Sequence, residues 1–178
     1  FFFFFFKFFF FFSKCLYLAY RVLQICDHIG IYMVIAGSYT PILMIPLGHV
    51  ARAQNLLIAE WVGFFFGTIF TAFADLSGVP VTQAIELISF LSMGCGVVMV
   101  WDTFSQLDYY LVHLCMLSGA TYLVGIIFFM LGDKKHPIYH SVWHLFVVFA
   151  AVLHWFGVYL FIVKKDMGEK MVNLLHNA

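Results

Sequence analysis

The sequence is poor in charge and lacks the short motifs that mark several large enzyme classes. Only 10% of its 178 residues are charged, whereas soluble domains carry roughly 25%. It contains no GxSxG, P-loop or GxGxxG pattern, so the enzyme classes that use these motifs have no support. Nine basic residues balance nine acidic ones, which excludes a basic nucleic-acid-binding protein.

Paired cysteine motifs and a signal peptide are also absent from the sequence. The four cysteines form no CxxC pair, and two of them lie inside apolar segments. We therefore interpret them as buried small hydrophobic residues and not as a disulfide framework. The N-terminus shows no charged region, short apolar region and small-residue cleavage site in the order that a cleavable signal peptide requires.

Apolar residues, in contrast, are abundant. They make up 64% of the chain, and the mean hydropathy is +0.99. No fold in water could cover so much apolar surface, so we predict an integral, multi-pass membrane protein.

The apolar residues fall into five segments joined by short connections. Each segment is near the roughly 20 residues that a helix needs to cross a bilayer. Open sheet edges are not tolerated in lipid, so the predicted fold is all-α, a polytopic transmembrane helical bundle. Gly63 and Gly67 have GxxxG spacing, which we interpret as helix packing. The predicted spans are residues 28–47, 56–76, 81–101, 109–131 and 140–163.

Four regions follow from this pattern. Residues 1–12 are eleven phenylalanines and Lys7, a low-complexity segment that we interpret as a gene-model artefact or the remnant of a further span. Residues 13–27 read as an interfacial connection, 28–163 as the five-span transmembrane domain, and 164–178 as a polar C-terminal tail.

Two histidines at the start of the last span are the main candidates for chemistry. His140 and His144 are four residues apart, about one helical turn, so both imidazoles project from one face of a helix. That spacing suits a metal ion bound by a single helix. The alternative is a pair of interfacial histidines without a metal. His136 reads as a loop or cap residue or a further ligand, and His154 as a buried, hydrogen-bonded histidine.

Asp27 lies at the start of the first predicted span. It could cap that helix, or it could contribute to a site with the histidine pair. Four crossings separate the start of the first span from the start of the fifth, so both starts lie on the same side of the membrane. A carboxylate near two imidazoles could hold a metal-bound water or act as its base. Three further acids read as interfacial caps or internal polar pairs, namely Glu60, Asp75 and Glu86.

Two motifs resemble a known family. The run DHIGIYMVIAGSYTP, from Asp27 to Pro41, resembles the DHxxIYxxIAGxYTP signature of the hemolysin III / progestin and adipoQ receptor family. The run HSVWHLFV, which begins at His140 and is followed by His154, resembles the last-helix motif of that family. Its form is most similar to the monocyte-to-macrophage differentiation factor branch. The resemblance covers about residues 21–163.

The resemblance implies a seven-helix membrane protein with the N-terminus inside and a zinc ion held by three histidines near the cytosolic face. His140 and His144 match two of these ligands, and Asp27 matches the aspartate that contacts the zinc-bound water. The five spans would be the third to seventh helices. The family's first zinc histidine falls near Lys7 here, and no histidine precedes His28. His28, His136 or a second water are the alternatives for that ligand.

Two functions follow as hypotheses. The first is an intramembrane zinc hydrolase that cleaves a lipid amide, as a ceramidase does, with Asp27 as the catalytic residue. The alternative is a non-enzymatic membrane receptor with structural zinc. A channel or transporter ranks last, because the centres of the spans lack charged residues. The expected partners are membrane lipid and a lipid or protein ligand, with no nucleic acid.

Overall fold

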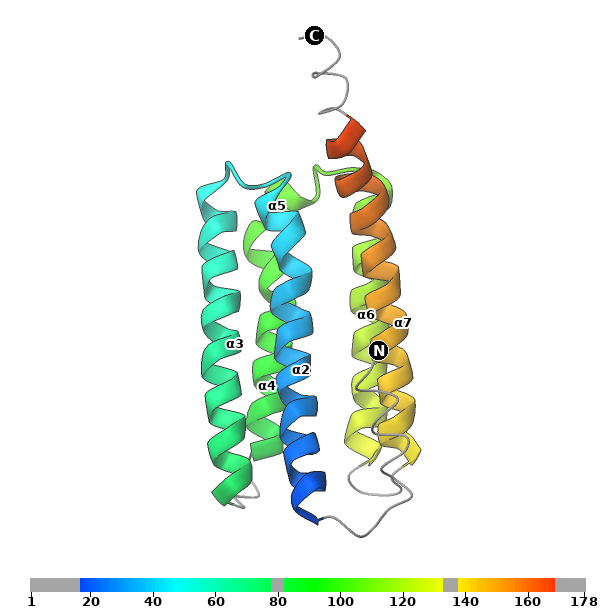
Figure 1. The fold of residues 1–178 in the computed structure, drawn as a ribbon. Helices are drawn as coiled ribbons and strands as arrows, with labels where there is room; N and C mark the ends of the chain where they lie inside the picture. Colours follow the sequence, from blue (N-terminus) through cyan, green and yellow to red (C-terminus); the bar gives the residue numbers. More distant parts are fainter. Residues whose placement is uncertain (1–16, 78–81, 133–137, 169–178) are drawn as a thin grey trace. The chain divides into compact units, whose positions relative to one another are not determined.

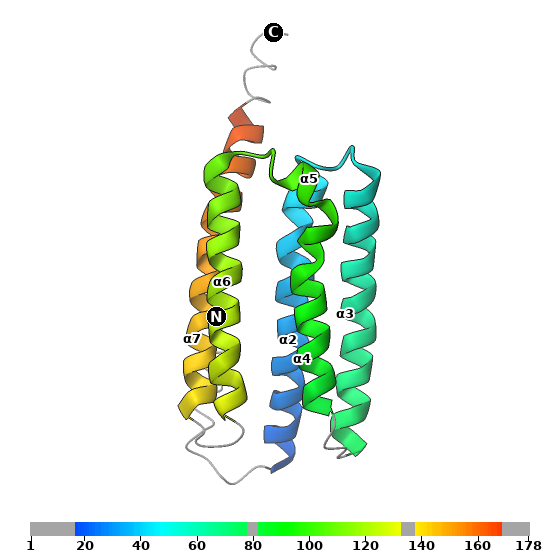
Figure 2. The same cartoon turned by 180° about the vertical axis from the view of Figure 1, so that it is seen from behind.

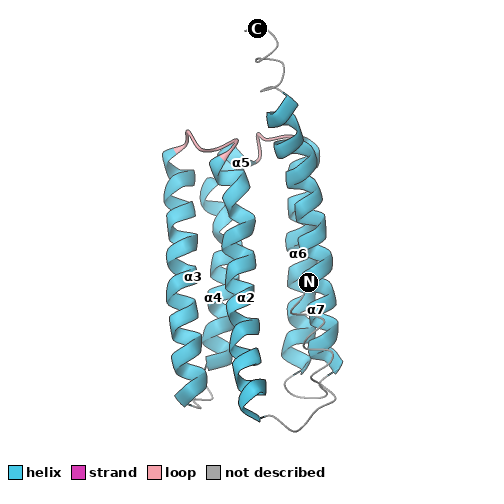
Figure 3. Ribbon diagram, viewed as in Figure 1, coloured by secondary structure: helices cyan, strands magenta, loops and turns pink. Residues whose placement is uncertain are grey.

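The structure, a computed structural model, describes residues 17–77, 82–132 and 138–168. The elements within these ranges are helical, which confirms the predicted all-α class (Figures 1 and 3). The phenylalanine-rich segment 1–12 and residues 169–178 of the predicted tail lie outside the described residues. The elements are α2 (Tyr17–Met44), α3 (Ala51–Ser77), α4 (Thr82–Gly94), the 3₁₀ helix η1 (Cys95–Val100), α5 (Trp101–Phe104), α6 (Tyr109–Gly132), α7 (Ile138–Val158) and the π-helical turn η2 (Tyr159–Val163).

Among the described residues, five helical stretches are long and apolar enough to cross a membrane, as the sequence predicts. Large apolar side chains stand exposed along them, for example Phe65, Phe66 and Phe73 on α3, as expected for surfaces that face lipid. The protein is therefore a multi-pass integral membrane protein. The spans are Val22–Met44, Ala51–Phe73, Ala84–Phe104, Tyr109–Leu131 and Ile138–Gly168.

The structure differs from the predicted spans in two places, the start of the first span and the interior of the third. The first described helix, α2, already includes Tyr17, because the chain from Tyr17 to Asp27 contains no glycine or proline that would end it. The third span changes from α-helix to 3₁₀ helix after Gly94. There the hydroxyl of Tyr39 donates to the carbonyl of Gly94 at 2.8 Å and accepts from the amide of Val97 at 3.0 Å. This side chain satisfies backbone groups at the transition that a continuous α-helix would pair internally.

The described chain divides into two compact units. The first unit contains residues up to Tyr39 together with Asn55–Met99, so it holds most of α2 and α3, and all of α4. These three helices run side by side (Figure 2). Its core is built around four buried residues, Tyr32, Ala36, Phe90 and Met93.

Gly67 sets the close approach of α3 to α2 inside this first unit. A Cβ at Gly67 would collide with the ring of Tyr32, and that ring also packs on Phe90 with centroids 4.5 Å apart. Gly63 likewise faces the side chain of Met93. Both glycines thus serve helix packing, as the sequence indicated.

The second unit contains Thr40–Gln54 and the chain from Val100 onward. Its main feature is the antiparallel pair α6 and α7, which lie side by side (Figures 1 and 2). The hydroxyl of Ser118 on α6 donates to the carbonyl of Ala150 on α7 at 2.8 Å, a buried bond between the two helices.

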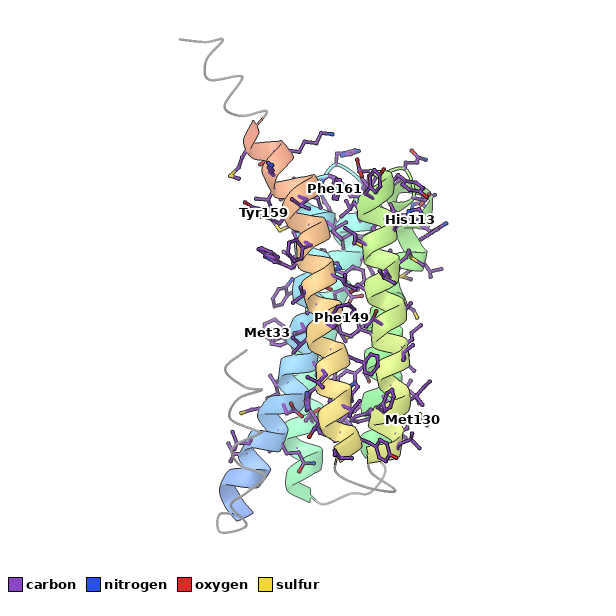
Figure 4. All side chains as sticks on the ribbon, turned by 90° about the vertical axis from the view of Figure 1, so that its right-hand side faces the viewer. Met33, His113, Met130, Phe149, Tyr159 and Phe161 are labelled. Carbon is purple, nitrogen blue, oxygen red and sulfur yellow. The ribbon has the colours of Figure 1, made fainter. Side chains whose placement is uncertain are left out.

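Aromatic residues gather toward one end of this pair. Tyr110 and Phe161 stack with centroids 6.0 Å apart. His113, Tyr159 and Phe161 lie toward the same end, and Met130 lies toward the opposite end of α6 (Figure 4). Such a cluster is typical of the level where a helix meets the membrane–water interface.

Candidate metal centre

The histidine pair lies in the first two turns of α7. The ring centroids of His140 and His144 are 4.8 Å apart, with the ring planes at 72°. Both side chains are half-buried. The helical spacing expected from the sequence is therefore present, and it brings two imidazoles together on one element without any help from tertiary structure.

A buried tryptophan packs against both rings. The side chain of Trp143 is 5% exposed, and its ring lies 5.2 Å from that of His140 and 4.6 Å from that of His144. Phe129, from α6, packs 4.8 Å from Trp143 and 6.0 Å from His140. These contacts restrict the rotamers of the histidines, since each ring has an aromatic neighbour.

Gly125 makes this aromatic packing possible. A Cβ at this position of α6 would lie 3.0 Å from the Cβ of Phe146 and 3.2 Å from the Cδ1 of Trp143. Only glycine leaves α6 and α7 close enough together for Trp143 to sit between them without a displacement. The role of Trp143 was not predicted, although its place inside the HxxWH run was the available signal.

Asp27 lies well inside α2, ten residues after the first residue of that helix. The interpretation of Asp27 as a helix N-cap is therefore wrong, because amides this far inside a helix already donate to carbonyls in the preceding turn. Its side chain is half-buried. Asp27 belongs to the first unit, and the histidine pair belongs to the second.

Asp27 and the two histidines are each of a residue type that can bind a metal ion. Asp27 offers a carboxylate oxygen, and His140 and His144 each offer an imidazole nitrogen. Zinc in proteins binds through such nitrogen and oxygen ligands.

His28 has a partner in its own unit. Its Nδ1 lies 3.0 Å from Oε2 of Glu86 on α4, and the hydroxyl of Thr71 on α3 donates to Oε1 of the same carboxylate at 2.7 Å. All three side chains are buried. The prediction that Glu86 belongs to an internal polar pair is thus confirmed, although the sequence did not reveal which residues pair with it.

The remaining candidates from the sequence are Glu60, His154, His136 and Asp75. Glu60 is buried and 3% exposed, on the side of α3 where Gly96 approaches its carboxylate. His154 is half-buried on α7, beyond the histidine pair. His136 and the side chain of Asp75 lie outside the described residues, so the predictions made for them stay predictions.

The fold and the site together define the class of membrane protein to which this chain belongs. In the residues that the structure describes, the chain is an all-helical, multi-pass membrane protein whose last span opens with two histidines four residues apart. It belongs to the haemolysin-III-related family, since the model of that family matches residues 2–155. The matched region begins inside the phenylalanine-rich segment and includes the two motifs up to His154.

Individual relatives agree with this assignment. The hemolysin-3 homolog of Bacillus subtilis (strain 168) is 33% identical over 146 residues, which are 80% of this chain and 64% of the relative. The human monocyte to macrophage differentiation factor is 30% identical over 143 residues, 80% of this chain and 56% of the relative. Hemolysin-3 of Bacillus cereus is 30% identical over 144 residues, 80% of this chain and 63% of the relative.

The chain thus spans less than two thirds of the length of these curated relatives. No solved structure matches it.

Proposed function

We propose that this protein binds zinc within the membrane through His140 and His144, and that it hydrolyses a lipid amide with Asp27 as the proton acceptor. The observation that carries the proposal is the pair of imidazoles, 4.8 Å apart on one helix and held by a buried tryptophan. Ionisable groups inside a membrane span are costly and are therefore functional candidates.

The count of the spans supports a meeting of Asp27 with the pair. Four crossings lie between the start of the first span, Val22, and the start of the fifth, Ile138. In a bilayer, an even number of crossings returns the chain to the side from which it began. Asp27 follows its span start by five residues and His144 by six, so both would lie at a depth of about 7–9 Å along their helices.

The chemistry of the donors supports zinc as the metal. Two neutral imidazoles and a carboxylate are common zinc ligands and partners. A bound zinc ion would lower the pKa of a coordinated water to about 7 and polarise the carbonyl group of a substrate.

The residues of the chain would supply the remaining steps of an amide hydrolysis. A water oxygen forms a bond to the carbonyl carbon of the lipid amide, and the Asp27 carboxylate accepts the proton that this water loses. The carbon–nitrogen bond then breaks, and the same proton passes to the leaving nitrogen. The products are a fatty acid and an amine, so that one water is consumed for each amide cleaved.

A turnover assay with a conservative substitution tests the proposal. We expect purified protein in lipid nanodiscs to bind zinc and to release fatty acid from a fluorescent ceramide. Asp27→Asn should keep the zinc and lower kcat by about 100-fold or more. The control is Asp102→Asn, which alters an acid that is exposed and paired with Arg52 at 2.6 Å, outside the proposed site.

Each result has a definite meaning for the proposal. Loss of turnover in Asp27→Asn with normal turnover in Asp102→Asn supports the hydrolase. Zinc binding without hydrolysis of any amide would contradict the hydrolase and favour the receptor with structural zinc. Absence of zinc from the purified protein and failure to take it up would contradict both.

A further inference from the structure

A buried polar contact joins all three helices of the first unit at the level of Asp27. His28 comes from α2, Thr71 from α3 and Glu86 from α4. The His28–Glu86 pair has side-chain exposures of 8% and 4%, and Thr71 is fully buried. We call these three residues the three-helix clamp. All three lie within candidate membrane spans.

Each oxygen of the Glu86 carboxylate has a polar neighbour in the clamp. Oε2 of Glu86 faces Nδ1 of His28 at 3.0 Å, and Oε1 accepts the hydroxyl of Thr71 at 2.7 Å. A buried polar contact of this kind adds little net stability compared with apolar packing, but it strongly disfavours arrangements in which the partners separate, because each would be left buried without its partner. Its main effect is therefore to fix how the helices are rotated against one another.

Packing on the same face of α2 reinforces that rotation. His28, Tyr32 and Ala36 follow one another at intervals of four residues, and their exposures are 6%, 0% and 0%. The ring of Tyr32 fills the space above Gly67 of α3 and packs on Phe90 of α4. A polar contact and an aromatic contact, one turn apart, thus hold the same stripe of α2 against its two neighbours.

This fixed stripe determines where Asp27 points. Successive residues of an α-helix are separated by about 100° around the axis, so Asp27 projects from a different face than its neighbour His28. Any rotation of α2 that separates His28 from Glu86 turns Asp27 by the same angle.

We propose that His28, Glu86 and Thr71 are positioning residues that fix the rotation of α2 and with it the direction of the Asp27 carboxylate. The clamp acts through the rotation of α2. This inference rests on the proposed function, and it assigns a reason for a buried polar contact within the membrane that the hydrolysis itself does not use.

Two nearly isosteric variants test the clamp. Glu86→Gln keeps the shape of the side chain and removes its charge, and Thr71→Val removes one hydroxyl. We expect each to lower kcat for ceramide about tenfold or more while KM changes little, and to alter the visible absorption spectrum of the Co²⁺-substituted protein. The matched control is Thr121→Val on α6, where the hydroxyl bonds only within its own helix, to the carbonyl of Leu117 at 2.8 Å.

An exchange of the two residues of the pair distinguishes a positioning role from a merely stabilising one. The exchanged pair His28→Glu with Glu86→His restores the contact in reverse, and we expect it to recover most of the lost kcat and the original Co²⁺ spectrum. The inference is overturned if Glu86→Gln and Thr71→Val lower the melting temperature but leave kcat and the Co²⁺ spectrum of the folded protein unchanged.

A readout that needs no metal distinguishes a failure of the clamp from a failure of the proposed function. In Asp27→Cys/His144→Cys, with the neighbouring Cys26 replaced by serine, a short thiol cross-linker should join positions 27 and 144, as identified by mass spectrometry of the linked peptides. Adding Thr71→Val should slow this reaction about tenfold. An unchanged rate would contradict the clamp whether or not the wild-type protein binds metal. No cross-link in either form would instead contradict the proposed function, because position 27 would not reach the histidine pair.

Discussion

At the scale of the residue, the two histidines could be predicted and their surroundings could not. The positions of His140 and His144 depend only on helical spacing, so sequence alone was sufficient to place their rings together. The packing of Trp143 against both rings depends on Phe129 and Gly125 of another helix, and no local pattern encodes that contact. The cap role given to Asp27 failed because the α2 helix starts earlier than the apolar pattern indicated.

Trp143 should be the main source of packing energy at the histidine pair. Trp143→Ala removes a side chain that is 5% exposed, and we expect the free energy of unfolding to fall by about 3–5 kcal/mol. Zinc affinity should fall as well, because both imidazoles lose their shared neighbour. Unfolding titrations and zinc binding by calorimetry would measure the two effects.

Trp155→Ala on the same helix is the matched control for that change. Its side chain is 57% exposed, so its removal should cost much less stability and leave zinc affinity unchanged. Equal losses for the two variants would contradict the role assigned to Trp143.

At the scale of the element, the number and type of the helices could be predicted, but not their internal changes. Five spans of suitable length follow from apolar runs, and all five are present. The 3₁₀ segment after Gly94 was not foreseen, because it depends on the hydroxyl of Tyr39, which lies 55 residues away in the sequence. The two glycines near this point, Gly94 and Gly96, were the only local signal.

The approach of α6 to α7 at Gly125 gives a prediction for this helix pair. Gly125→Ala places a methyl group 3.0 Å from the Cβ of Phe146, so we expect a loss of about 1–3 kcal/mol in the free energy of unfolding. Gly119→Ala on the same helix is the control, because a Cβ there meets nothing within 4 Å. Alanine should be neutral or stabilising at that site, and a comparable loss there would refute the packing argument.

The start of α6 gives a second prediction for an element. Asp108 accepts the backbone amides of Tyr110 and Leu111 at 2.9 and 3.4 Å, as an N-cap does. Asp108→Ala should therefore lower the melting temperature through a loss of about 1 kcal/mol. Asp102→Ala breaks only an exposed ion pair with Arg52 and should cost between about 0 and 1 kcal/mol. Thermal unfolding of both variants would decide whether the cap matters more.

At the scale of the whole molecule, the membrane class and the family could both be predicted from the sequence. Composition predicted a multi-pass membrane protein, and the motifs around Asp27 and His140 led to the family that the comparisons show. The contact of His28 with Glu86 and Thr71 could not be predicted, because it joins residues up to 58 positions apart on three helices. Long-range polar contacts of this kind leave no periodic signal in a single sequence.

Zinc should stabilise the entire fold if it binds as proposed. A ligand that binds only the native state raises its stability in proportion to the logarithm of its concentration over Kd, by about 2.7 kcal/mol at 100 times Kd. We therefore expect a chelator to lower the melting temperature and added zinc to restore it. The melting temperature of His140→Ala should respond to neither treatment; an equal response would place the zinc elsewhere.

The zinc content of the purified protein tests the central claim most directly. Metal analysis by mass spectrometry should find about one zinc ion per chain in the wild-type protein and in Asp102→Ala. It should find far less in His140→Ala and His144→Ala, because each removes one of the two helical ligands. Full zinc content in either histidine variant, or no zinc in the wild-type protein, would contradict the proposal that this histidine pair is a metal centre.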